Sequence, residues 1–129
     1  MSYELSDAER DGVLASDGDK QYWHFVKKAA DWGEVWVINN GDHRGHVTDE
    51  GVRLLAVWPH PGFIDGQLDG AWEGFEPEKI EVHDFLDLLG ELESSGMEVA
   101  VLPSADGTHL RQPAPIVAGD LREELKRVE

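Results

Sequence analysis

The 129-residue sequence contains no cysteine. Disulfides, thiolate nucleophiles and cysteine-ligated zinc or iron–sulfur sites are therefore excluded. The sequence also has no long hydrophobic run, since no apolar stretch approaches the ~20 residues needed to cross a bilayer. Its first residues are polar and acidic, unlike the basic and then apolar start of a signal peptide. We therefore expect a soluble, cytoplasmic protein.

Basic residues are scarce. The chain has 11 lysines and arginines against 27 acids, which gives a formal net charge of −16. Such a surface repels phosphate backbones and anionic lipid heads, so nucleic acid and membrane are poor partners. A basic protein partner would instead be attracted. The simpler interpretation is that the acids serve solubility or salt tolerance and say nothing about partners.

Catalytic and cofactor-binding motifs are also missing. The 14 glycines form neither Gly-x-Gly-x-x-Gly nor a phosphate-binding loop ending in Lys-Ser/Thr. No serine stands at motif spacing from a histidine and a carboxylate, so no activated nucleophile is indicated. We therefore expect no cofactor and assign no catalytic residue.

What the sequence does contain is one unusual segment, residues 54–77, LLAVWPHPGFIDGQLDGAWEGFEP. Its apolar start predicts a buried strand, Arg53–Trp58, which Pro59 ends because proline lacks the N–H that a sheet requires. Pro61 suits the first position of a helix that would run to about Leu68. His60 is a poor cap for such a helix.

Aromatic residues concentrate in this segment and suggest an interaction surface with a concavity nearby. Aromatic side chains contribute strongly to the binding energy of protein interfaces. Packing of the same rings in the core is the alternative. The residues that would form the surface are Trp58, His60, Phe63, Trp72, Glu73 and Phe75.

Six histidines invite a metal-site interpretation. His43 and His46 lie three residues apart in a predicted strand, which would point them to opposite faces. In a loop they could bind a metal with Asp42 or Asp49. Surface histidines are the simpler interpretation, and we assign no metal ligand. The alternative function is a small metal-binding protein or hydrolase-like enzyme using His60, Glu73 and His43 or His46.

The spacing of apolar residues predicts helices and strands in alternation. Helices are predicted over Asp19–Asp31, His83–Glu93 and Val117–Val128, after a short helix that begins near Asp7. We expect Trp23 to widen the buried stripe of the first of these. Strands are predicted at Glu34–Asn39, Arg44–Thr48, Arg53–Trp58 and Met97–Leu102. Lys79–Val82 is a short strand or an extended lead-in, and Thr108–Gln112 follows a turn at Pro103–Gly107.

Turn residues connect the first three of these strands. Asn40-Gly41 and Asp49-Glu50-Gly51 predict two successive hairpins, and so three consecutive antiparallel strands. The sequence therefore predicts one α+β domain, residues 1–129. It would have a mainly antiparallel sheet of about four to six strands with helices packed on it.

Four segments carry a resemblance: KKAADWGEVW, WPHPGF, AWEGFEP and VAVLPSADG, which begin at Lys27, Trp58, Ala71 and Val99. In order and spacing they resemble the domain-of-unknown-function family 2750, small, mostly bacterial single-domain proteins. The resemblance covers nearly the whole chain, although residues 39–51 are longer and richer in histidine. It implies a single-domain fold and assigns no role to any residue. The best hypothesis is a non-enzymatic binding or accessory module that engages a protein partner through an acidic, Trp/Pro-containing surface.

Overall fold

The computed structural model describes residues 7–14, 18–64, 68, 72–103 and 110–128. Four α-helices, six strands and a short 3-10 helix occur within them. Their order is α1 (Asp7–Leu14), α2 (Gly18–Trp32), β1 (Glu34–Asn39), β2 (His46–Asp49), β3 (Val52–Val57), η1 (Pro61–Phe63), β4 (Glu76–Glu81), α3 (Val82–Ser95), β5 (Glu98–Val101), β6 (Leu110–Pro113) and α4 (Ala114–Val128). None of the helices described has the length and apolar composition needed to cross a bilayer.

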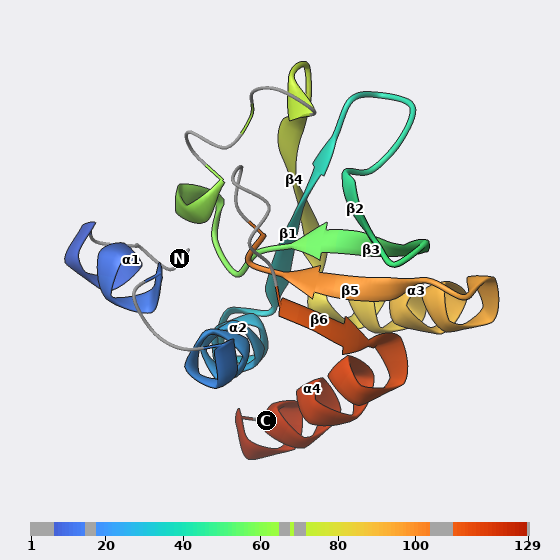
Figure 1. The fold of residues 1–129 in the computed structure, drawn as a ribbon. Coiled ribbons are helices and arrows are strands. Elements are labelled where there is room, and N and C mark those ends of the chain that lie inside the picture. The colour runs from blue at the N-terminus through green and yellow to red at the C-terminus, as the bar shows by residue number, and fades with distance from the viewer. Residues whose placement is uncertain (1–6, 15–17, 65–67, 69–71, 104–109, 129) are drawn as a thin grey trace.

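The strands form two sheets, which confirms the predicted α+β class. β1 pairs with β4, and the other four strands lie in the order β2-β3-β5-β6. Every pairing is antiparallel except β3 with β5, which is parallel. β1 and β4 run across the four-stranded sheet, and an isolated bridge between Trp36 and Trp58 joins the two (Figure 1).

The turn predicted at Asn40-Gly41 is present, but the three consecutive antiparallel strands are not, because β1 and β2 belong to different sheets. The hairpin predicted at Asp49-Glu50-Gly51 is confirmed.

β1 takes β4 as its partner, and its pairing with the segment after the turn is short. It consists of an isolated bridge between Asn39 and Arg44 and of backbone hydrogen bonds from Asn40 to His43 and from Gly45 to Ile38. Within the turn, Oδ1 of Asn40 accepts hydrogen bonds from the amides of Asp42 and His43, at 2.9 and 2.8 Å. The carbonyl of Gly45 accepts from the amide of Ala56, so the chain goes on beside β3 rather than beside β1.

The helices lie close to where their apolar spacing predicts them. α3 begins on Glu81, whose carboxylate accepts from the amides of His83 and Asp84, and it ends at Gly96 with φ of 74°. The helix predicted from Pro61 to Leu68 is only the 3-10 turn η1, and residues 65–67 lie outside the described part. His60 is a better cap than predicted, because its Nδ1 accepts from the amide of Gly62 at 2.9 Å.

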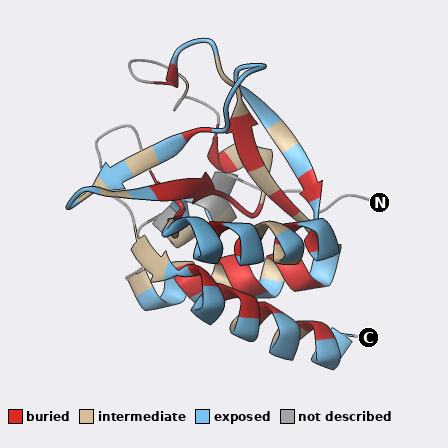
Figure 2. Cartoon of the chain, turned by 90° about the vertical axis from the view of Figure 1, so that its right-hand side faces the viewer, coloured by how far each residue is buried: buried red, intermediate tan, exposed pale blue. Residues whose placement is uncertain are grey.

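Three helices, α2, α3 and α4, turn their apolar stripes toward the strands, as the buried and exposed faces in Figure 2 show. The buried stripe of α2 consists of Tyr22, Phe25, Val26, Ala29 and Ala30. Trp23 is not part of it, contrary to expectation, and is 42% exposed. One residue along a helix turns the side chain by ~100°, so Trp23 stands beside the stripe, with its ring against Tyr22.

Candidate functional site

Three of the six residues predicted to form an interaction surface are buried. Trp58, Phe63 and Trp72 are only 1%, 3% and 8% exposed. The indole N–H of Trp58 donates to the carbonyl of Pro103 at 3.2 Å, and its ring meets Trp72 edge to face, with centroids 5.7 Å apart. These rings therefore hold the core together and offer little area to a partner.

The other three residues keep accessible surface. Glu73 is exposed, and His60 and Phe75 are half-buried. His60 is engaged as the cap of η1, and the amide of Phe75 donates to the carbonyl of Trp72. Residues 65–67 and 69–71, which separate the two halves of the predicted surface, lie outside the described part.

A pocket of about 330 Å³ lies elsewhere, between the β2–β3 hairpin and α3. Strand register explains how its wall is built. His46 pairs with Leu55, and Arg53 lies two residues before Leu55 on the same face. In the parallel pair of β3 with β5, Leu54 is opposite Glu98. The residues just before these two, Arg53 and Met97, therefore also lie beside each other. One face of the sheet thus presents an imidazole, a guanidinium and two apolar side chains side by side.

The helix α3 supplies the opposite wall. Leu88 and Leu92 are four residues apart and so lie on one helical face, and both line the pocket. Leu92 is buried and Leu88 half-buried. The floor of the pocket is therefore aliphatic, formed by Leu55, Leu88, Leu92 and Met97.

The loop between β1 and β2 brings two further polar side chains, His43 and Arg44. Gly45 presses this loop onto the sheet, because its amide donates to the carbonyl of Ile38 at 2.8 Å and its carbonyl accepts from Ala56 at 3.2 Å. A Cβ at this position would overlap the buried side chain of Ile38. Only glycine lets the loop approach so closely.

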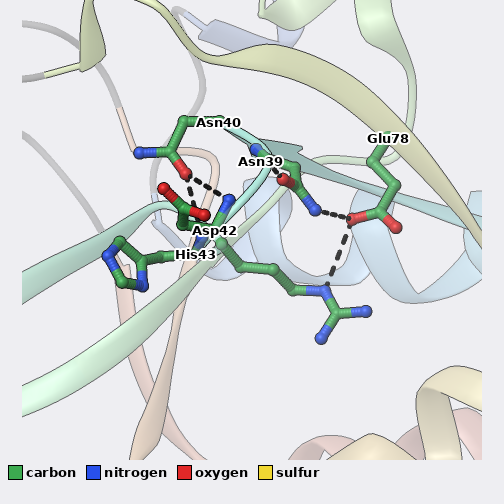
Figure 3. A network of polar contacts seen from close by, with 7 residues as sticks. Asn39, Asn40, Asp42, His43 and Glu78 are labelled. Atoms are coloured by element: carbon green, nitrogen blue, oxygen red, sulfur yellow. Dashed lines mark hydrogen bonds and ion pairs between the residues drawn. The ribbon is translucent and has the colours of Figure 1, made fainter.

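A polar network behind the pocket orients Arg44. Its Nε lies 3.4 Å from Oε1 of Glu78 on β4, and the same oxygen accepts a hydrogen bond from the Asn39 side chain at 3.1 Å (Figure 3). Glu78 thus ties the loop to the other sheet. It does not itself line the pocket.

Arg53 differs from Arg44 in its contacts. It is exposed, and no ion pair of its side chain is found in the described part of the chain. A second hollow, of about 560 Å³, shares Arg53 and Met97 with the first and continues to Gly51 and to Ser95 and Gly96 at the end of α3. Arg53 therefore stands between two adjoining hollows.

The lining has one chemical character. Four side chains carry or can gain positive charge (His43, Arg44, His46 and Arg53), and the rest are aliphatic. Among the described residues, no carboxylate, hydroxyl or amide side chain lines the pocket. Such a site can hold an anion by charge-assisted hydrogen bonds above an apolar floor.

The metal interpretation gains nothing from this geometry. His43 and His46 do reach the same pocket, but their neighbours there are two arginines and not a carboxylate. Within the described residues, no group of three or more His, Asp or Glu side chains is arranged to hold a metal ion. His60 is not in this lining and stands apart from His43 and His46.

Of the pocket residues, the sequence singled out only His43 and His46, and it missed Arg44, Arg53 and the aliphatic floor. The turn between β2 and β3 could have indicated part of this wall from the sequence. Glu50 and Gly51 both have positive φ, 51° and 80°, as a two-residue turn of the primed type requires. That turn alone fixes the pairing of Asp49 with Val52 and so places His46 opposite Leu55.

A family model described as "Protein of unknown function (DUF2750)" matches residues 22–122. No curated protein and no solved structure was found to match the chain. The matched residues contain the whole pocket, from His43 to Met97.

Proposed function

The chain belongs to the DUF2750 family of proteins of unknown function, and we propose that it is a non-enzymatic binding module for a small anionic ligand. One observation carries the proposal. Two arginines and two histidines converge on one pocket in a chain whose acids outnumber its lysines and arginines by 27 to 11. An acidic surface repels anions in general, so a local positive site is the place where one would be held.

Guanidinium chemistry supports an anion as the ligand. Arginine presents fixed N–H donors that match the oxygens of a carboxylate or phosphate, and such charged hydrogen bonds are about twice as strong as neutral ones. In the described part of the chain, the one ion pair of Arg44 is with Glu78, and it involves Nε of the guanidinium. Arg53 has no such competing partner there.

The lining favours binding over catalysis. Acyl or phosphoryl hydrolysis needs a nucleophile or a base oriented by a third group. Among the described residues around this pocket there is no hydroxyl nucleophile, and no carboxylate orients His43 or His46. The site thus supplies positive charge and apolar area without groups to activate a reaction.

The protein partner predicted from the sequence stays a prediction. Its surface would now consist of His60, Glu73 and Phe75, since the other three predicted residues are buried. An exposed acid next to it in sequence, Glu76 at the start of β4, is compatible with a basic partner. The anion pocket rests on a more specific arrangement of side chains, and we take it as the primary function.

A matched pair of variants tests the proposal. Arg53→Gln removes one guanidinium from the pocket. Arg122→Gln makes the same change of charge at an exposed position on α4, outside the lining. Thermal unfolding and calorimetric titration would be measured with sodium acetate, inorganic phosphate and sodium octanoate, each at an ionic strength matched with chloride. A ligand at ~100 times its Kd adds about 2.7 kcal/mol to the free energy of unfolding.

We expect at least one of these anions to raise the Tm of the wild type by several degrees. Arg53→Gln should lose most of that increase, and Arg122→Gln should keep it. The proposal is wrong if no anion stabilises the wild type more than chloride does, or if Arg53→Gln responds like the wild type.

A further inference from the structure

We infer that the ligand is a medium-length alkyl chain that ends in an anionic group. This inference rests on the proposed function and adds the chemical class of the ligand. It comes from the separation of the lining into a positively charged rim and an aliphatic floor.

The rim accounts for the anionic end. His43 and Arg44 come from the β1–β2 loop, and His46 and Arg53 come from the exposed ends of two paired strands. All four are exposed, so a charged group bound there keeps contact with water. An anion at the mouth therefore gains charged hydrogen bonds without full desolvation.

The floor accounts for the alkyl chain. Leu55, Leu88, Leu92 and Met97 offer no hydrogen-bond donor or strong acceptor, so a polar group placed among them would lose its bonds to water without replacement. Leucine and methionine have flexible side chains, and methionine adapts its shape to irregular ligands. A hydrocarbon chain is the ligand part that fits such a surface.

The same lining argues against other common ligands. Sugars, nucleosides and peptides carry several neutral polar groups, and each would need a partner inside the pocket. The described lining holds no hydroxyl, amide or carboxylate side chain to provide one. Neither Phe, Tyr nor Trp lines it among the described residues, so the usual platform for a nucleobase is missing as well.

Size limits the chain length. A volume of about 330 Å³ is near the lower end of the range of small-molecule pockets, which is ~300–1,000 Å³. The adjoining hollow past Arg53 and Met97 is also lined by Gly51, Val52, Ser95 and Gly96, so it offers less aliphatic surface to further methylenes. Medium-length chains should therefore bind best.

The test is a homologous series of straight-chain monocarboxylates, from acetate to decanoate, titrated calorimetrically below their critical micelle concentrations. Octanol and octylamine serve as neutral and cationic controls of equal chain length. Octyl phosphate, compared with octanoate, distinguishes a phosphate from a carboxylate as the anionic end. We expect Kd to fall about fourfold for each added methylene until the pocket is filled, which corresponds to about 0.8 kcal/mol per methylene. Octanol and octylamine should bind at least tenfold more weakly than octanoate.

Two variants separate the chain from the anionic end. Leu88→Gln places an amide on the half-buried part of the floor without changing the charge, and it should flatten the dependence on chain length. Arg53→Gln should weaken every anion by a similar factor and leave that dependence intact. Because Arg53 is exposed, its variant should fold even if Leu88→Gln does not.

The outcomes distinguish this inference from the proposed function. If acetate or inorganic phosphate binds as tightly as octanoate, the alkyl chain is wrong and the anion site stands. If octanol matches octanoate, the anionic end is wrong. If no anion binds, both the inference and the proposed function fail. If Arg53→Gln and Leu88→Gln both bind octanoate as tightly as the wild type does, the ligand does not occupy this pocket.

Discussion

Trp58 lies where the two sheets meet. Its backbone N–H donates to the carbonyl of Trp36 and its own carbonyl accepts from Trp36, at 2.9 and 2.8 Å, so this residue joins β1 to the end of β3. Its side chain is buried against Trp72 and bonded to Pro103. Trp58, which the sequence suggested as part of an interaction surface, therefore connects the two sheets.

Replacing this indole tests that role. We expect Trp58→Ala to lower the free energy of unfolding by ~3–5 kcal/mol, the usual cost of removing a large aromatic side chain from a core. Trp58→Phe should cost less, because it keeps a six-membered aromatic ring and loses only the rest of the indole with its bond to Pro103. Trp23→Ala is the control at a 42% exposed position and should change stability by less than ~0.5 kcal/mol. Urea unfolding would measure all three, and a small effect of Trp58→Ala would contradict the assignment of Trp58 to the core.

Tyr22 on α2 is bound to α4 through its hydroxyl, which donates to Oδ2 of Asp120. Burial raises the pKa of Tyr22 above its ordinary value, and the hydrogen bond to Asp120 and the negative charge of that residue raise it further. The unfolded chain should release the proton near pH 10, while the folded chain keeps it. Tyr22 therefore contributes stability that is fully present below about pH 10 and is lost as the pH rises above it.

The free energy of unfolding should accordingly fall between about pH 10 and 11, and it should fall less steeply in Tyr22→Phe. Urea titrations at a series of pH values would measure both slopes. Absorbance at 295 nm provides an independent check, since Tyr22 should not ionise near pH 10 while the chain remains folded. Equal alkaline slopes in the two proteins would rule out the linkage.

At the scale of single elements, the β1–β2 loop is where the sequence was least informative. Helical spacing located α2, α3 and α4, because each buries one stripe of apolar residues. The Asp49-Glu50-Gly51 turn gave the β2–β3 pairing, because its two residues with positive φ allow one register. The pairing of β1 with β4 could not be predicted, since these strands are far apart in sequence and no local signal connects them.

The candidate site was only partly predictable for the same reason. His43 and His46 were visible as histidines, but a pocket needs long-range neighbours. Leu88 and Leu92 come from a helix that spacing predicts well, yet nothing in the sequence indicates which strands that helix covers. Conversely, the buried aromatics looked like an interface because a sequence pattern does not distinguish a core ring from an exposed one.

Gly45 provides a test of how the loop is held. Gly45→Ala places a methyl group against the buried side chain of Ile38, and we expect it to cost ~1–3 kcal/mol, as overpacking of a core does. Gly90→Ala is the matched control. It lies within α3 where an added Cβ meets nothing, so it should stabilise the protein by ~0.5–1 kcal/mol.

Chemical unfolding would give both values, and octanoate titration of Gly45→Ala would show whether the loop also shapes the pocket. We expect weaker binding in Gly45→Ala and unchanged binding in Gly90→Ala. If Gly45→Ala is as stable as the wild type, the close approach of the loop does not limit the structure.

For the whole molecule, the dominant feature is the contrast between a charge of −16 and one local cluster of positive and titratable side chains. The net negative charge and the local positive cluster act on an anion over different distances. Under the proposed function, Arg53 and its neighbours would contact the anion directly, where salt screens little, whereas the acids act from across the protein. The Debye length is ~30 Å at 0.01 M salt and about 8 Å at 0.15 M, so added salt removes mainly the long-range repulsion.

This contrast predicts an unusual salt dependence. We expect octanoate to bind faster and more tightly at 150 mM than at 10 mM sodium chloride, the opposite of binding to a basic protein. Chloride that competes for the pocket would weaken octanoate binding as salt is added, so competition cannot produce the expected increase in affinity. Stopped-flow and calorimetric titrations at several salt concentrations would test it, and a steady loss of affinity with salt would show that the local cluster outweighs the net charge at every distance.

Amide chemical shifts, followed while octanoate is added to the ¹⁵N-labelled protein, would test most directly whether the pocket between the β2–β3 hairpin and α3 binds an anion. We predict saturable changes that share one Kd and gather at residues 43–46, 53–55, 88–92 and 97. The exposed cations of α4, Lys126 and Arg127, should show none. Changes that scatter over the surface without saturating, or that gather around His60 and Glu73, would contradict the claim.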